Sequence, residues 1–235
     1  MTDNDDFNEN TVIPQVKSAW KPFISYCNDC AKGFVNWMPK FVRRMFWVLV
    51  SGTAAALVAM VVMQRKLIYV PYMPPDSRKR VATPTEYGIK QDDWREVWLT
   101  AKDDSSIHLH AYWINVLKTE SNASNNGVQQ QKKPTLIFCH ANAGNMGHRL
   151  DIVRVLRSVL QCNVLIFSYR GYGLSNGSPN ELGMKRDAEA AFEYAMEQAE
   201  CDNERMMIYG QSIGGAVAFH LACKYSDKVS ITKVA

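Results

Sequence analysis

A serine lies between two glycines in the stretch Gly210-Gln-Ser-Ile-Gly214, which has the Gly-x-Ser-x-Gly pattern. The apolar run Met206-Met-Ile-Tyr209 before it predicts a buried strand, and residues 213–225 after it predict a helix. In a tight strand-to-helix turn a serine hydroxyl is exposed, and only small residues fit two positions to either side. The alternative is a glycine-rich turn at the start of a packed helix. The context favours Ser212 as a nucleophile, with Gly210 and Gly214 as the glycines that permit the turn.

A second turn could stabilise the negative charge that develops in acyl transfer. The stretch His140-Ala-Asn-Ala-Gly-Asn145 follows the apolar run Thr135-Leu-Ile-Phe-Cys139. One backbone N–H for such an oxyanion comes from the residue after the serine, here Ile213, and another from a loop after an earlier strand. Asn142 is the candidate donor in that loop. A phosphate-binding loop is the alternative, but the signature Gly-x-x-x-x-Gly-Lys-Ser/Thr is missing.

Neither a cofactor nor a metal is predicted. Gly171-Tyr-Gly173 follows a predicted strand, but Asn176 stands where a dinucleotide-binding loop needs glycine. Cys27 and Cys30 have the spacing of half a zinc or redox site, but no second pair lies nearby. A structural or lipidated pair of cysteines is the favoured interpretation.

The general base for Ser212 is missing from its expected place. In this type of site the order along the chain is serine, then aspartate or glutamate, then histidine. After Ser212 the sequence holds Asp227 and one histidine, His220. His220 lies on the same predicted helix, about 12 Å further along its axis, which is too far for a hydrogen bond. The triad is therefore incomplete, and we expect the chain to be a truncated, alternatively spliced or incorrectly predicted product.

Strands with two kinds of pattern must carry these turns. Residues 96–100 and 107–114 alternate with period two and predict a hairpin-like pair, in which His108 and His110 lie on a solvated face. Residues 135–139 form a short unbroken apolar run, typical of a strand covered on both faces, and residues 163–169 and 206–209 predict further buried strands. The polar stretch from Leu117 to Lys133 predicts a surface loop.

Predicted helices alternate with these strands. Apolar residues repeat at three- and four-residue spacing over residues 150–160. A further helix is expected to start at Ser178-Pro-Asn-Glu181, which reads as a capping box with proline at the first helical position. This alternation predicts an α/β fold, with a mostly parallel sheet and helices on both of its faces.

One stretch is apolar on every side. Residues 45–63 are 19 residues without a charge, preceded by Arg43 and Arg44 and followed by Arg65 and Lys66. Such a helix is about 28 Å long, close to the thickness of a bilayer's hydrocarbon core. A signal peptide would start nearer the N-terminus, and a buried core helix rarely lacks charge on every face. We expect a single-pass protein of the endomembrane system or plasma membrane, whose partner is the lipid bilayer.

Orientation in the membrane stays open. Within 20 residues of the stretch there are four basic residues on the N-terminal side and five on the C-terminal side, which decides nothing. Asn122 and Asn176 begin glycosylation sequons, which matter only if the C-terminal part is lumenal. The formal net charge of +4, with both signs interspersed, excludes a typical nucleic-acid-binding protein.

Together these residues resemble the α/β-hydrolase superfamily, and specifically its bud-emergence-type membrane serine hydrolases. The resemblance rests on a long set of spaced motifs: Gln64-Arg-Lys-Leu-Ile-Tyr69, Thr85-Glu-Tyr-Gly88, residues 140–148, Tyr169-Arg-Gly-Tyr-Gly173 and Gly210-Gln-Ser-Ile-Gly-Gly215. It implies an α/β-hydrolase fold that is incomplete at the C-terminus, and loop-shaping roles for His140, His148 and Gly144. It also implies hydrolysis of esters, thioesters or amides through an acyl-enzyme on Ser212.

The expected organisation has four parts. They are an N-terminal polar and amphipathic segment (1–44), a transmembrane helix (45–63), a linker (64–93) and a partial α/β-hydrolase domain (94–235). The resemblance implies a small-molecule or lipid/acyl substrate. The alternative is a non-catalytic membrane-anchored scaffold or regulatory pseudo-hydrolase. The missing base favours this alternative for the chain, whereas the intact elbow favours the hydrolase.

Overall fold

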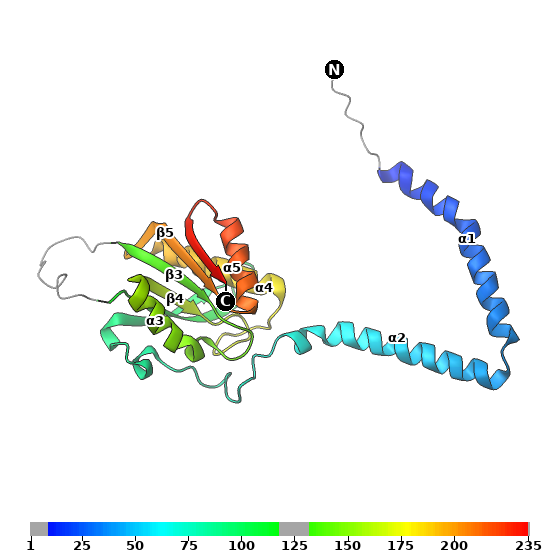
Figure 1. Cartoon of the computed structure of the whole chain (residues 1–235), viewed down its shortest axis with the longest axis horizontal. Helices are drawn as coiled ribbons and strands as arrows, with labels where there is room; N and C mark the ends of the chain where they lie inside the picture. The colour runs from blue at the N-terminus through cyan, green and yellow to red at the C-terminus, as the bar shows by residue number, and fades with distance from the viewer. Residues whose placement is uncertain (1–8, 118–131, 235) are drawn as a thin grey trace, which may run out of the picture. The chain divides into compact units, whose positions relative to one another are not determined.

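The computed structural model describes residues 9–117 and 132–234 of the chain. These fall into two compact units, Met1–Met63 and Gln64–Ala235, which we treat one at a time (Figure 1). Asn122 and most of the predicted surface loop around it lie outside the described residues.

The first unit is helical. It contains α1 (Glu9–Trp37) and most of α2 (Lys40–Ile68), whose last residues belong to the second unit. Helix α2 has a mean hydropathy of 2.2 over its most apolar window and no buried residue, so its length and composition suit a membrane-crossing helix. It is longer than the predicted stretch, because the basic residues at both ends continue the helix. Cys27 and Cys30 are exposed free thiols on α1.

The second unit is built on a six-stranded sheet with the order β1-β2-β4-β3-β5-β6. Strands β1 (Trp94–Thr100) and β2 (His108–Ile114) are antiparallel, as the period-two pattern predicted, and β2 also runs antiparallel to β4. Neighbours among the remaining strands are parallel to each other: β3 (Lys133–Cys139), β4 (Asn163–Phe167), β5 (Cys201–Gly210) and β6 (Val229–Val234). The predicted α/β fold with a mostly parallel sheet is confirmed.

Helices cover both faces of this sheet (Figure 1). Helix α3 (Leu150–Leu160) packs with one cluster of core residues, and α4 (Glu181–Glu197) and α5 (Ile213–Lys224) pack with the other. Strand β2 shows why the sheet needs two covers. Leu109, Ala111 and Trp113 belong to the α4–α5 side, while Tyr112 and Ile114 belong to the α3 side.

Two local predictions are wrong. Asn180, not Ser178, caps α4, because its side chain accepts a hydrogen bond from the Gly183 N–H at 2.9 Å. His110 is buried rather than solvated. Its ring stacks on Trp98, with the ring centroids 4.9 Å apart. Its backbone N–H donates to Ser175 Oγ at 2.9 Å, so the loop after β4 covers this residue.

Candidate active site

Ser212 stands in the turn that joins β5 to α5. Its backbone has φ 53° and ψ −120°, and its side chain is exposed and makes no capping bond to the helix. A residue other than glycine in such a conformation stores on the order of 1–3 kcal/mol of strain. This is the backbone geometry that a nucleophile elbow needs, because it turns the hydroxyl outward at the end of the strand.

The two glycines of the motif allow α5 to lie directly against the sheet. A methyl group at Gly214 would meet the carbonyl oxygens of Cys139 and His140, the latter at 2.6 Å. A methyl group at Gly210 would lie 2.7 Å from the side chain of Ala218. The Gln211 N–H also donates to Cys139 O at 3.1 Å. The elbow is thereby held against the start of the loop at residues 140–145, which we call the oxyanion loop.

The two predicted donors are backbone N–H groups. Within the described ranges, neither the Asn142 N–H nor the Ile213 N–H donates a hydrogen bond to another residue. Ile213 begins α5, so its N–H is among those that a helix leaves unpaired at its N-terminus. Both groups are therefore available to a ligand, and their roles as oxyanion donors stay predictions.

The Asn142 side chain ties the oxyanion loop to residues 68–80, a segment that we call the strap. Its Nδ2 donates to Ile68 O at 2.6 Å. Its Oδ1 accepts from the Val70 N–H at 3.2 Å and from the Tyr172 hydroxyl at 2.6 Å. One amide thus joins the end of α2, the strap and the loop after β4.

Two more residues of the oxyanion loop bind the strap. The Gly144 N–H donates to Met73 O at 2.5 Å. The Asn145 Nδ2 donates to Ser77 O at 2.7 Å and to Arg80 O at 2.9 Å. Gly144 has φ 84°, and a methyl group there would lie 2.8 Å from His148 Nδ1. Glycine is required at this turn for both reasons.

His140 is fully buried at the start of the loop. Its Nδ1 lies 2.7 Å from Ala141 O, and its ring packs on Tyr169, with the centroids 4.4 Å apart. Burial lowers the pKa of His140 to about 4, so the ring is neutral at pH 7. Its Nε2 has no hydrogen-bond partner among the described residues. The Tyr169 hydroxyl donates to His140 O at 3.2 Å, which fits a loop-shaping position.

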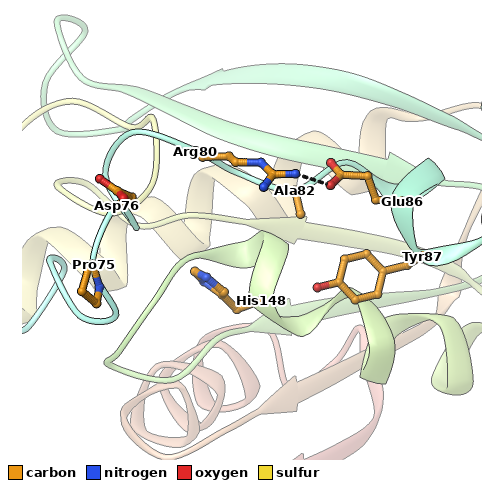
Figure 2. Close-up of a pocket in the computed structure, with 7 residues that line it drawn as sticks. All are labelled: Pro75, Asp76, Arg80, Ala82, Glu86, Tyr87 and His148. Atoms are coloured by element: carbon orange, nitrogen blue, oxygen red, sulfur yellow. Dashed lines mark hydrogen bonds and ion pairs between the residues drawn. The ribbon is translucent and has the colours of Figure 1, made fainter.

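His148 lines a polar cavity of about 480 Å³ beneath the strap (Figure 2). Its Nδ1 accepts from the Asn145 N–H at 3.1 Å, which leaves the proton of the neutral ring on Nε2. Burial lowers the pKa of His148, and the positive charge of Arg149 adds to this. The other residues lining the cavity are Pro75, Asp76, Arg80, Ala82, Glu86 and Tyr87. Ser212 is not among them.

His220 is held by helix α4. Its Nε2 lies 2.8 Å from Glu189 Oε1, and the other oxygen of the same carboxylate pairs with Arg186 and Lys224. His108 is exposed at the start of β2 and lines a shallow pocket with Trp98 and Asn176. All five histidines of the chain are therefore placed, and none is hydrogen-bonded to Ser212 in the described part of the molecule. Asp227 is exposed and pairs with Lys228.

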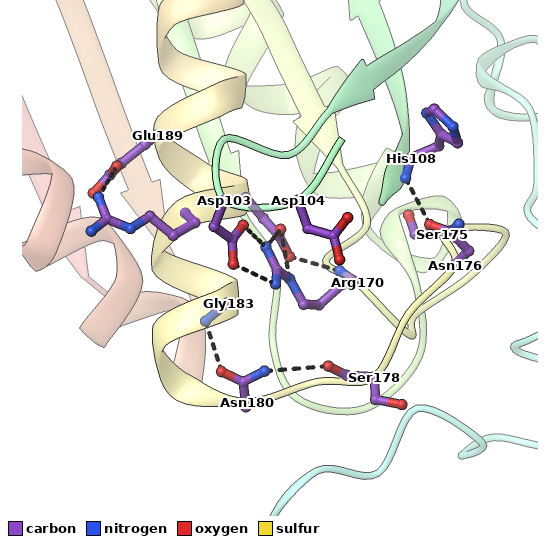
Figure 3. A network of polar contacts seen from close by, with 12 residues as sticks. Asp103, Asp104, His108, Arg170, Ser175, Asn176, Ser178, Asn180, Gly183 and Glu189 are labelled. Carbon is purple, nitrogen blue, oxygen red and sulfur yellow. Dashed lines mark hydrogen bonds and ion pairs between the residues drawn. The ribbon is translucent and has the colours of Figure 1, made fainter. Parts of the chain in front are cut away.

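A charge network that joins the buried Arg170 and Asp187 to the exposed Asp103 fixes the loop after β4 (Figure 3). The Arg170 guanidinium donates to both oxygens of Asp103, at 2.9 and 2.6 Å, and to Asp187 Oδ1 at 2.9 and 2.7 Å. The Arg170 backbone N–H reaches Asp187 Oδ2 at 2.8 Å. Burial raises the pKa of Asp187 to about 6, and the hydrogen bonds and positive charge of Arg170 offset this only in part. The network holds the chain between Tyr169 and Tyr172, the residues that contact His140 and Asn142.

Comparison with known proteins gives the family of the chain. The model of a family described as alpha/beta hydrolase fold matches residues 134–230. The chain is 42% identical over 186 residues to the protein bem46 of Schizosaccharomyces pombe, covering 77% of this chain and 57% of that protein. The chain belongs to the α/β-hydrolase family. Its likeness to Bem46 confirms the resemblance to bud-emergence-type α/β hydrolases that its motifs predicted.

Two further proteins are similar to this α/β hydrolase. An uncharacterized membrane protein of Saccharomyces cerevisiae is 32% identical over 179 residues, covering 76% of this chain and 56% of that protein. An alpha-beta hydrolase from Vibrio vulnificus has a similar fold, with a TM-score of 0.54 at 21% identity, covering 72% of this chain and 56% of that one. The chain spans slightly more than half the length of these curated relatives.

Sequence reasoning placed the elbow and the oxyanion loop side by side but missed what supports the loop. The strap was interpreted as a linker, although Asn142 and Asn145 bind it through five of its backbone groups together with Gly144. Tyr172 and Arg170 lie in a motif that was considered as a dinucleotide-binding loop and noted for its resemblance, but neither residue was given a supporting role. The signal that could have found them is the pair of asparagines in a short loop, since such amides bind backbone groups when partly buried.

Proposed function

We propose that the protein is a membrane-anchored serine hydrolase that cleaves an ester, thioester or amide through an acyl-enzyme on Ser212. The observation that carries the proposal is the strained backbone of the exposed Ser212, in an elbow that the Gln211 N–H ties to Cys139 O at the start of the oxyanion loop. Within the described residues, the Ile213 and Asn142 N–H groups have no partner. The Ser212 oxygen attacks the carbonyl carbon while the Ile213 and Asn142 N–H groups stabilise the oxyanion. The leaving group departs with a proton, and water then hydrolyses the acyl-enzyme.

The proton of Ser212 has to pass to a base, and the described histidines are held elsewhere. Loss of the histidine lowers turnover by on the order of a million-fold in a characterised serine protease, and an oxyanion hole with binding alone retains roughly 10³–10⁴ over water. We therefore expect residues 1–235 to hydrolyse a p-nitrophenyl ester no faster than the Ser212→Ala variant. Circular dichroism on both proteins controls for folding.

A fluorophosphonate probe, followed by peptide mapping, tests the nucleophile. The 235-residue chain is expected to remain unlabelled, and sequencing the transcript beyond codon 235 tells whether an acid and a histidine follow. A product that carries them should label at Ser212 and not in its Ser212→Ala variant. Absence of labelling there would reject the hydrolase. Labelling of the short chain at Ser212 would instead show that His140, His148 or a partner chain supplies the base.

A non-catalytic scaffold is the second candidate, and one observation favours it. His220, which follows Ser212 on α5, pairs with Glu189, and the side chains of Arg186 and Lys224 bind the same carboxylate. In that case the fold acts as an interaction surface on the membrane, and Ser212→Ala leaves its cellular function unchanged.

We also propose that α2 spans the membrane once, in the endomembrane system or plasma membrane. The length and hydropathy of α2 support this, as does the likeness to a protein named as a membrane protein. The chain should stay in the pellet after extraction with alkaline carbonate. Deleting residues 1–63, which leaves the strap intact, should release the protein into the soluble fraction. Release of the undeleted chain by alkaline carbonate would contradict a spanning helix.

A further inference from the structure

We propose that the strap holds the oxyanion loop at the surface of the lipid bilayer, and that the acyl group attacked by Ser212 belongs to a lipid of that membrane. The inference rests on the proposed function and on α2 as a spanning helix, and it adds the class of substrate. Three observations carry it: a short covalent path, a packed strap, and the side chains that the strap exposes.

The path from the apolar stretch to the oxyanion loop is short. Ile68 ends α2, five residues after Met63, and these residues add about 7.5 Å of helix. The Asn142 Nδ2 lies 2.6 Å from Ile68 O. Along this path the Asn142 Nδ2 lies at most roughly 10 Å from the end of the apolar stretch, which puts it near the outer boundary of a headgroup layer about 5–8 Å thick. Residues 64–68 and Asn142 belong to the same compact unit, so the contact of Ile68 with Asn142 lies within that unit.

The strap is packed rather than loose. Tyr69 packs against the core cluster on the α4–α5 side, and Pro71 is buried. Arg78 donates to Ser175 O at 2.7 Å, which fixes the far end of the strap to the loop after β4. Its carbonyls at Met73 and Ser77 receive the bonds from the oxyanion loop. The strap therefore transmits the position of the end of α2 to the site instead of acting as a free tether.

The strap and the last turn of α2 expose side chains that suit a membrane interface. Large fractions of their apolar side chains are accessible: Leu67 64%, Ile68 51%, Tyr72 73% and Met73 61%. Arg65 and Lys66, in the last turn of α2, are exposed as well. Tyrosine and aliphatic side chains next to basic residues are the composition that binds at the boundary of headgroups and acyl chains. Because these residues continue directly from α2, the occupant of this surface is the bilayer that α2 crosses.

The depth of single labelled cysteines in vesicles tests the placement. The exposed Cys27, Cys30 and Cys223 are first replaced by serine, and the remaining cysteines are buried. An environment-sensitive fluorophore is attached at Tyr72→Cys on the strap or Ala143→Cys in the oxyanion loop. Val159→Cys is the control, since Val159 is 72% exposed and lies near the end of α3, just before the start of β4. The oxyanion loop follows the opposite, C-terminal ends of the parallel strands, and the five residues of β4 are about 16 Å long.

Each protein is reconstituted in vesicles of phosphatidylcholine and phosphatidylserine, with and without lipid spin-labelled near the top of the acyl chain. Quenching at positions 72 and 143 should exceed quenching at 159 by about twofold or more, as expected for side chains in the interface. Equal quenching at all three positions would overturn the proposal. Quenching at 72 without quenching at 143 would also overturn it, because the strap would touch the membrane and the loop would not.

The substrate class has its own test. In a product that labels at Ser212, a long-chain fluorophosphonate dispersed in vesicles should react faster than a short-chain, water-soluble one, and the reverse order would reject a lipid substrate. Quenching does not depend on a reaction at Ser212, so it should be the same in the Ser212→Ala variant. A failure of lipid placement is thus read separately from a failure of Ser212 as the nucleophile.

Discussion

The two halves of the candidate site are held in place by different physical means. Backbone contacts that leave no room for a side-chain carbon hold the elbow, and they involve residues of its own motif together with the end of β3. Asparagine side chains hold the oxyanion loop, and the bonds of Asn142 to Val70 and Ile68 join residues 72 and 74 positions apart in the chain. A short motif can therefore encode the first half, whereas the second depends on a distant segment.

The largest effect is expected where the elbow is most crowded. In Gly214→Ala the new methyl group would meet two carbonyl oxygens of the backbone, which cannot move as a flexible side chain can. We expect a loss of about 3 kcal/mol or more in the free energy of unfolding. Urea unfolding measures it, with Gly33→Ala as the control because nothing lies within 4 Å of a methyl group there. A loss below that of the control would contradict steric support of the elbow.

The polar half should respond to pH through Asp187. Its pKa is about 6 in the folded protein, against an ordinary value of 3.8, so between these pH values the folded state binds more protons than the unfolded state. Stability of the wild type should therefore fall relative to Asp187→Asn as pH rises from 4 to 7, by on the order of 2–3 kcal/mol, and then level off. Parallel urea titrations across this range measure the difference. A difference that grows in favour of the wild type would mean that Arg170 dominates.

Asn142→Ala should loosen the oxyanion loop without disturbing the elbow. Three hydrogen bonds are lost, and we expect about 2 kcal/mol of destabilisation because water replaces part of them. Amide exchange should accelerate at residues 68–73 and 141–145 but not at 210–215. Tyr172→Phe is the graded comparison, since it removes only one of the three bonds. Equal acceleration at the elbow would show that the two halves are one cooperative unit.

The smallest effect concerns the strain at Ser212. Ser212→Gly should be more stable than Ser212→Ala by about 1 kcal/mol, because glycine adopts φ 53° without strain and this outweighs its larger unfolded-state entropy. The two variants lose the same hydroxyl, so thermal unfolding of the pair isolates the backbone effect. An alanine variant as stable as the glycine variant would mean that the turn stores no strain.

The sequence predicted the parts of the fold that follow from periodicity. The apolar runs that became β3, β4 and β5 lie buried on both faces, and the uncharged stretch within α2 was evident from composition alone. Burial of His110 was not predictable, because the loop that covers it comes from beyond β4. The cap of α4 also depends on a contact with the loop after β4, since Pro179, just before the cap, packs so closely on Gly171 that a methyl group there would lie 2.6 Å from the proline ring.

Asn176, which begins the second sequon, is exposed, but both polar atoms of its side chain form hydrogen bonds. Its Oδ1 accepts from the backbone N–H of His108 at 2.7 Å (Figure 3). Its Nδ2, the atom to which a glycan is joined, donates to Ser106 O at 2.7 Å. In the folded protein this amide closes the start of β2 against the loop after β4. A glycosyltransferase needs the same amide in an extended, accessible chain. With a lumenal C-terminal part, a sugar could therefore be joined to Asn176 only while the hydrogen bond from Nδ2 to Ser106 O is broken, which means before the fold is complete.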